Sequence, residues 1–154
     1  MRKLLILAII AVSTIAYSMS YAAEADKNVT IAEMKGTVEV LPQGSSAWVP
    51  ATTWMKLGSG DMVSTKDASY ADLNFDGLGQ SALVRIDANS SMKIESYIAS
   101  ANVAERKIAL NLAMGDILVK ANKLKDESQF QVRTPTSVVG VRGTGFKVHV
   151  TSEK

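Results

Sequence analysis

The sequence contains no cysteine, and only one histidine and three prolines among its 154 residues. The absence of cysteine excludes disulfides, thiol nucleophiles and thiolate metal sites, so stability must come from a hydrophobic core and backbone hydrogen bonds. The single histidine, His149, lacks the convergent partners that a metal site or a Ser-His catalytic set requires. We therefore expect a protein without enzymatic activity, metal or cofactor.

Long apolar runs are also missing, except for Leu4–Val12 near the N-terminus. Two basic residues precede this run, and Ser20-Tyr-Ala22 follows it with small residues where a signal peptidase needs them. These features predict a signal peptide at residues 1–22, followed by a flexible leader at 23–28. The alternative is an uncleaved signal anchor, the only form in which we expect contact with a membrane. Cleavage is favoured because the apolar core is shorter than the ~20 residues of a spanning helix.

An excess of charge of one sign is absent from the exported chain. The whole sequence has 17 Lys and Arg against 15 Asp and Glu, a formal net charge of +2. Residues 1–22 carry two of the basic residues and none of the acidic ones, so the rest has 15 of each and no net charge. A neutral chain has no overall attraction to nucleic acid, and we expect no nucleic-acid partner. We expect the protein in the periplasm, with release to the extracellular space as the alternative.

What the sequence does contain is short runs in which apolar and polar residues alternate. The clearest runs are Val29–Met34, Val38–Val40, Ala71–Phe75, Ala82–Ile86 and Ile108–Leu112. Alternation marks half-buried strands, and its recurrence roughly every 8–12 residues, with turn residues between, predicts an all-β fold. We expect one domain, residues 29–154, built of short antiparallel strands in a twisted, solenoid-like stack. The first two runs are expected to form a hairpin-like pair.

Glycine beside aspartate marks the sharpest expected turns, which are Gly60-Asp61, Asp76-Gly77 and Gly115-Asp116. We expect Asp61 and Asp116 to hydrogen-bond within their turns. The first and last pairs occupy corresponding places in two similar segments, Leu57–Val63 and Leu112–Leu118. A strand, a Gly-Asp corner and a second strand that recur in this way suit a wound sheet.

The densest run of β-branched residues is Phe130–Val150, which also holds Pro135 and three glycines. Because Pro135 has no N–H and biases its predecessor towards extended geometry, one strand should end there and another begin. The glycines permit close backbone approach or a positive φ. Arg142 is expected to bind backbone carbonyls or a carboxylate such as that of Asp61, since an unpaired buried charge is costly. The motif that we expect to lock the fold comprises Thr134, Pro135, Gly140, Val141, Arg142, Gly143, Thr144 and Phe146.

Two further candidate sites have simpler explanations. Trp48 and Trp54 would be ligand contacts if they were exposed, but we expect them to cover one end of a small core, because tryptophan is mostly buried. Asp72–Gly77 matches the first half of a calcium-binding loop, yet Leu83 stands where such a loop needs a bidentate glutamate. We therefore expect an ordinary strand and turn there, and no metal.

Several of these motifs, taken in order, resemble a known family. They include Gly36-Thr-Val-x-Val40, Leu57-x-x-Gly-Asp61, Asn89-Ser-Ser-Met-x-Ile94 and Phe130-x-Val-x-Thr-Pro-Thr-x-Val-Val-Gly-Val-Arg-Gly-Thr-x-Phe-x-Val148. The pattern resembles the FecR domain, an exported β-rich domain first associated with regulators of iron-siderophore signalling. The resemblance extends over nearly all of Val29–Val150.

The resemblance implies an exported, non-enzymatic module that binds or senses another envelope protein or component, with a role in signal transduction. Full-length regulators of that family carry a cytoplasmic segment that binds a sigma factor. Only three residues precede the apolar run, so we expect no such segment here.

Edge strands are the expected contact surfaces, because an open all-β stack can add a partner strand at its edge. The surfaces are Asp76–Gln80, Asn122–Gln129 and the edge near Phe146–Val150. One alternative is a structural envelope or matrix protein whose strands assemble into arrays. The other is a glycan- or peptidoglycan-binding module that uses Trp48 and Trp54.

Overall fold

The computed structural model describes residues 27–75, 82–98, 107–121, 129–141 and 145–151. Within these ranges the chain forms strands and turns, and no helix there is long and apolar enough to cross a membrane. The strands are β1 (Val29–Lys35), β2 (Val38–Leu41), β3 (Val49–Pro50), β4 (Lys56–Leu57), β5 (Met62–Thr65), β6 (Tyr70–Phe75), β7 (Ala82–Ile86), β8 (Ser91–Ile98), β9 (Lys107–Ala121), β10 (Gln129–Arg133), β11 (Val138–Val141) and β12 (Gly145–Val150).

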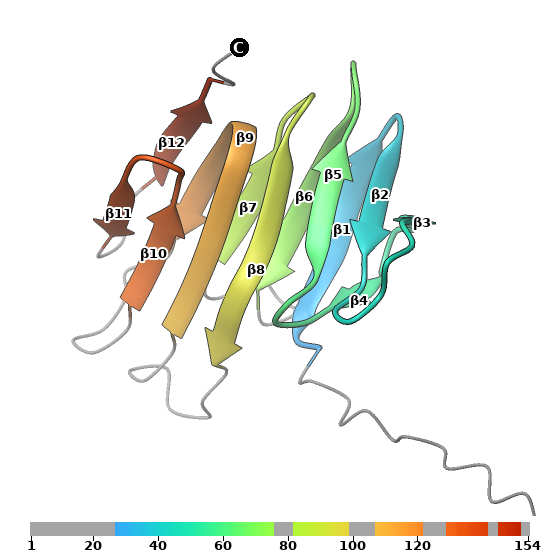
Figure 1. The fold of residues 1–154 in the computed structure, drawn as a ribbon, viewed down its shortest axis with the longest axis horizontal. Coiled ribbons are helices and arrows are strands. Elements are labelled where there is room, and N and C mark those ends of the chain that lie inside the picture. Colours follow the sequence, from blue (N-terminus) through green and yellow to red (C-terminus); the bar gives the residue numbers. More distant parts are fainter. Residues whose placement is uncertain (1–26, 76–81, 99–106, 122–128, 142–144, 152–154) are drawn as a thin grey trace, which may run out of the picture.

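The strands form two layers that share β9 (Figure 1). The front layer has the order β3-β2-β5-β8-β9-β10-β11, and the back layer has the order β4-β1-β6-β7-β9-β12. The first half of β9 pairs with β8 and β10, and its second half pairs with β7 and β12. The result is one sheet, curled along β9 so that its two layers face each other across the core.

The prediction of an all-β fold is confirmed, and the predicted antiparallel pairing holds for most of the strand pairs among the described residues. One pair differs, because β10 runs parallel to the first half of β9, with Phe130 opposite Ile108. This direction arises because β9 passes into the back layer before the chain returns to the front layer at β10. The strand order is that of a curled sheet, and the solenoid-like stack stays a prediction.

The core lies between the layers and is built from the inward positions of alternating strands. In β6, for example, Leu73 and Phe75 are fully buried, and Phe75 meets Tyr97 of β8 edge to face, with ring centroids 5.6 Å apart. Each fully buried side chain of this size contributes about 1.5–3 kcal/mol relative to exposure. Aromatic contacts of this kind, from one layer to the other, help hold the two layers together.

The chain passes between the layers at corners, and the first of them overturns a prediction. β1 pairs with β4 and β6 in the back layer, whereas β2 pairs with β3 and β5 in the front layer. The hairpin-like pair expected from these two runs is therefore wrong. Gly36, which adopts a φ of +75°, turns the chain from one layer into the other instead of folding it back beside itself.

Each of two corners is supported by its own buried serine. Ser69 Oγ accepts a hydrogen bond from Thr37 N at 2.9 Å, beside Gly36, and Ser90 Oγ accepts one from Asp116 N at 2.9 Å, beside Gly115. Both serines are buried, so these bonds give a partner to backbone N–H groups that could not reach water. Neighbouring corners are thus stacked on one another at one side of the sheet.

Candidate functional site

A groove opens between β11 of the front layer and β12 of the back layer, at the C-terminal side of the molecule. Its volume is about 700 Å³. The lining residues come from the bend of β9, the β10–β11 turn and the two strands, and they are Ala113, Thr134, Pro135, Thr136, Ser137, Val139, Phe146, Lys147, Val148, His149, Val150 and Thr151. In this part of the fold the two layers do not close over each other.

The bend in β9 creates the floor of the groove. The pairing of β8 with β9 shifts register between Ser91 and Met92, which leaves Ala113 as an extra residue on β9. Gly115 follows with a φ of +90°, so the strand turns into the back layer at this point. β10 pairs with β9 up to Asn111, and β12 pairs with it from Gly115 onwards. Ala113, in the stretch between these two pairings, lines the groove.

The β10–β11 turn forms one wall and is held by its own hydroxyl groups. Thr134 N donates to Ser137 O at 2.8 Å, and Ser137 N donates to Thr134 Oγ1 at 3.0 Å. Pro135 lies inside this turn, where the backbone N–H that proline lacks is not needed for a strand hydrogen bond. Val139 of β11 lines the groove next to the turn, so the wall combines polar and apolar surface.

The opposite wall is β12, whose two faces differ in character. Phe146, Val148 and Val150 face the core side, and Phe146 packs edge to face against Phe130 with centroids 6.0 Å apart. Lys147 and His149 alternate with them and are exposed. The alternation therefore gives β12 one apolar face and one basic face.

The basic face of β12 is tied to the neighbouring strand through Asp116. Lys147 Nζ lies 3.1 Å from Asp116 Oδ1, and His149 Nδ1 lies 2.9 Å from the same oxygen. A second carboxylate, that of Asp87, lies 3.8 Å from Lys147 Nζ. Partial burial opposes ionisation of Asp116, but the hydrogen bonds from Lys147 and His149 outweigh it and lower the pKa of this carboxyl below its ordinary value.

Both strands that flank the groove are edge strands within the described part of the chain. There, β11 pairs only with β10, and β12 pairs only with β9. An edge strand presents N–H and C=O groups that can pair with another chain. The groove therefore combines two backbone edges with a lining of mixed polar and apolar side chains, which suits an extended peptide segment.

Part of the predicted fold-locking motif lies at this groove. Thr134, Pro135 and Phe146 line it, and Gly140 and Val141 lie in β11, where they pair with Gln131 and Phe130. Gly140 has no positive φ, and nothing lies within 4 Å of a Cβ built on it, so neither explanation offered for this glycine applies. Arg142, Gly143 and Thr144 lie outside the described residues.

The two Gly-Asp turns that the structure describes use their aspartates differently. Asp61 is buried, and its carboxylate accepts hydrogen bonds from Gly58 N at 2.9 Å and Gln43 N at 2.7 Å. Gly60 precedes it with a φ of +93°. The carboxylate of Asp116 instead contacts Lys147 and His149 of β12. Asp76-Gly77 lies outside the described residues, as do most of the predicted loop surfaces Asp76–Gln80 and Asn122–Gln129.

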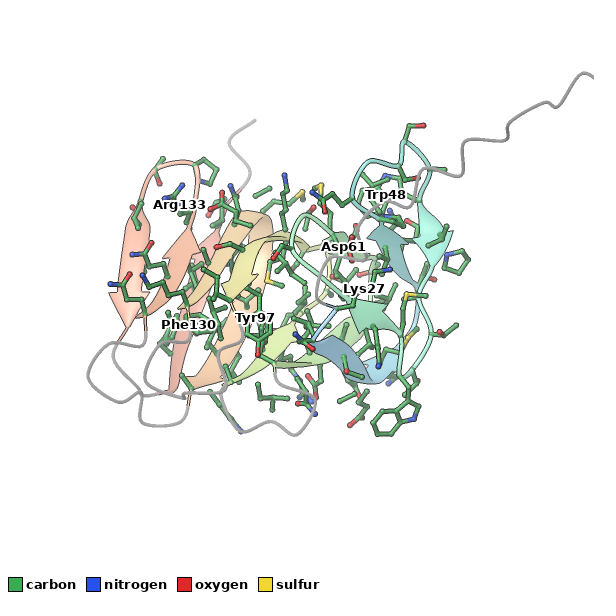
Figure 2. All side chains as sticks on the ribbon, turned by 90° about the horizontal axis from the view of Figure 1, so that it is seen from below. Lys27, Trp48, Asp61, Tyr97, Phe130 and Arg133 are labelled. Carbon is green, nitrogen blue, oxygen red and sulfur yellow. The ribbon has the colours of Figure 1, made fainter. Side chains whose placement is uncertain are left out.

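The expectation that the two tryptophans cover the core is wrong. Trp48 is 41% exposed and Trp54 is 71% exposed. The turn before β4 holds Trp54 at a φ of +69° through a hydrogen bond from its N–H to Ile31 O, and Ala51 is the residue of this segment that enters the core. Figure 2 shows Trp48 at the end of the molecule opposite to Phe130 and Arg133.

The aspartate of the half-matched calcium loop has a structural partner. Asp72 lies in β6 and is nearly buried, and the Arg85 guanidinium of β7 binds both of its oxygens, at 2.7 Å and 2.6 Å. This bidentate bond raises the pKa of Arg85 further above its already high value. Arg85 also lies 4.7 Å from the centre of the Tyr70 ring. Among the described residues, no group of three or more potential ligands could hold a metal ion.

The cluster of Lys147, His149 and Asp116 was not found from the sequence. The alternation of Phe146, Val148 and Val150 already placed the lysine and the histidine together on the other face. What the sequence does not contain is the pairing of β12 with the second half of β9, which puts His149 directly opposite Asp116.

Comparison with known proteins identifies a family for most of the chain. A family model described as FecR protein matches residues 61–154, which include β5–β12 and the whole groove. No curated protein and no solved structure matches the chain.

Proposed function

Because the chain belongs to the FecR protein family, we propose that it is an exported sensing module without enzymatic activity that contacts another envelope protein. The family is a regulatory one, which supports a role in signal transduction rather than catalysis. The predicted signal peptide at residues 1–22 supports export, with the periplasm as the site of action.

The observation that carries this proposal is the groove between β11 and β12. It offers two strand edges and several apolar side chains in one place, and it belongs to the segment that the family model matches. A partner that adds an extended segment here gains main-chain hydrogen bonds from the edge and side-chain contacts from the interior. The mechanism is thus recognition of a strand, with no chemical step.

Site-specific photocrosslinking in intact cells tests the proposal. A benzoylphenylalanine at Ser137, in the groove wall, should yield an adduct with one envelope protein, recovered in the periplasmic fraction. Thr53, exposed beside Trp54 at the other end of the molecule, is the matched control position. The captured protein should then bind the purified chain. Recovery of the protein in the cytoplasm, or equal adducts from both positions, would contradict the proposal.

A second candidate function is glycan binding, and the exposure of Trp54 favours it. An aromatic side chain that is 71% exposed at a positive φ is costly to maintain, and such strain gathers at ligand sites. The same experiment separates the two functions. A ladder of glycan-containing adducts at Thr53, with none at Ser137, would replace the first candidate with the second.

A further inference from the structure

We propose that the groove receives an extended segment in which apolar residues alternate with acidic ones, added as a strand beside β12. This inference deepens the function proposed above and rests on it. It names the chemistry of the partner segment, which strand recognition by itself leaves open.

The two faces of β12 dictate the alternation. A strand that pairs with β12 shares its pleat, so side chains on one of its faces enter the groove next to Phe146, Val148 and Val150. Side chains on its other face stand beside Lys147 and His149. Every second residue of the partner segment must therefore be apolar, and those between must suit a basic neighbour.

The charges near the groove select acidic residues for the outer face. Among the described residues that line the groove, Lys147 and His149 are the charged or titratable ones, and none is acidic. The carboxylates that pair with Lys147, those of Asp116 and Asp87, lie on the β9 side of β12, away from its free edge. Lys147 remains 57% exposed beside these carboxylates, so an acidic residue of a strand at the free edge can still approach its ammonium group. Opposite charges on directly paired strands attract, and like charges repel.

A second copy of this chain fits the edge less well. If β12 paired antiparallel with another β12 about Val148, Lys147 of each copy would face His149 of the other. If it paired parallel and in register, Lys147 and His149 of one copy would face the same residues of the other copy. Both arrangements bring basic side chains together, which disfavours self-association through this edge.

The dimensions set the length of the segment. β12 has six residues and β11 has four. A segment of about six residues in extended conformation is roughly 20 Å long, enough to follow β12 along the whole groove. Its inward side chains, two or three in number, would fit within the space of about 700 Å³ between the layers.

Designed heptapeptides test the proposal by fluorescence anisotropy with the full-length chain recovered from the envelope. The first is Thr-Val-Glu-Val-Glu-Val-Thr. The second replaces both glutamates by lysines, and the third keeps the composition of the first but groups its valines together. We expect the first peptide to bind about tenfold more tightly than the second, because the attraction between Lys147 and the glutamate that faces it becomes a repulsion. It should also bind more tightly than the third, which cannot place its valines on one face.

Charge reversal on the protein provides the reciprocal test. Lys147→Glu should reverse the preference, so that the lysine peptide binds better than the glutamate peptide. Lys66→Glu is the matched control, because Lys66 is similarly exposed (54% against 57%) and also forms an ion pair, but with Glu39. It should leave the preference unchanged. Lys147→Gln, which adds no repulsion with Asp116, replaces Lys147→Glu if that variant melts early, and it should abolish the preference.

Amide hydrogen exchange distinguishes strand addition from contact through side chains alone. A bound strand should slow exchange in residues 145–150, and the Lys66→Glu variant should show the same protection. Equal binding of the two charged peptides, or a preference that survives Lys147→Glu, would overturn the inference. If no heptapeptide binds but crosslinking at Ser137 succeeds, the acidic strand is refuted while the proposed function stands. If neither peptide binding nor crosslinking is seen, the inference and the proposed function are both refuted. An adduct between two copies of this chain at Ser137 would show that a second copy occupies the edge.

Discussion

At the scale of single residues, two corners of the fold use the same arrangement. Gly36 and Gly115 both have positive φ, and each lies against the hydroxyl group of a buried serine. A Cβ at Gly36 would lie 2.3 Å from Ser69 Oγ, and one at Gly115 would lie 2.2 Å from Ser90 Oγ. Close approach and backbone conformation therefore both require glycine at these positions.

The variant Gly115→Ala should lower the free energy of unfolding by about 2–4 kcal/mol, from the positive φ and the clash with Ser90 together. Gly44→Ala is the control, because Gly44 has a φ of +76° but nothing within 4 Å of its Cβ position. It should cost only about 1 kcal/mol. Urea denaturation of both variants measures the difference, and equal costs would show that the contact with Ser90 is not tight.

Asp116 gives the fold a dependence on acid pH. Its pKa is lowered in the folded protein by hydrogen bonds from Lys147 and His149, which outweigh the opposing effect of burial. A lowered pKa means that the ionised carboxylate stabilises the fold at pH values above its ordinary pKa of 3.8. This contribution is lost as the pH falls through the folded-state value.

The variant Asp116→Asn should therefore be less stable than the natural chain at pH 7, by no more than about 1 kcal/mol for a partly exposed pair. This difference in stability between the variant and the natural chain should disappear as the pH approaches 3. Thermal melts at several pH values measure it, with Asp67→Asn, at an exposed corner residue, as the control. A gap that stays constant from pH 7 to pH 3 would mean that the carboxylate charge plays no part.

Single residues also mark what the sequence can and cannot predict of the site. Phe146, Val148 and Val150 alternate with polar residues, and such a pattern can be read from the sequence because a strand presents every second residue to the same side. The glycine at 140 looked like a steric requirement, yet the structure has open space there. Residue type shows which conformations are allowed. Whether a neighbour occupies the space depends on contacts across the fold.

At the scale of elements, the sequence predicted strands better than their partners. The runs at Val29–Met34 and Val38–Val40 are β1 and β2, but they lie in different layers. Alternation carries information about which face of a strand is buried and none about which strand lies beside it. A short link with glycine fits a hairpin and a corner equally well, so packing of Ser69 against Gly36 decides between them.

The longest strand, β9, changes its buried face along its length. Ile108, Leu110 and Leu112 are buried before the bend, and Ile117 and Val119 are buried after it. The inward positions thus move from even to odd numbers across Ala113–Gly115. An inserted residue and a glycine at positive φ allow this change, because together they shift the pleat by one position. The same bend opens the floor of the groove, so the element that joins the layers also creates the candidate site.

At the scale of the whole molecule, the sharing of β9 should make the two layers a single folding unit. Leu112 belongs to the half of β9 in the front layer and Ile117 to the half in the back layer, and both are fully buried. Truncation of either to alanine should lower the free energy of unfolding by about 2–4 kcal/mol. Because neither layer keeps its central strand without the other, the loss should reach both layers in each variant.

Hydrogen exchange of peptides from β5 in the front layer and β6 in the back layer measures this coupling. In Leu112→Ala and in Ile117→Ala, protection should fall by the same factor in both peptides. Leu118→Ala is the control, because Leu118 is only partly buried and lies on the opposite face of β9 from Ile117, and its effect should be smaller. If Leu112→Ala loosened β5 while β6 kept its full protection, the layers would be separate units. The groove between them could then widen without unfolding, and a partner strand would select a form with a wider groove.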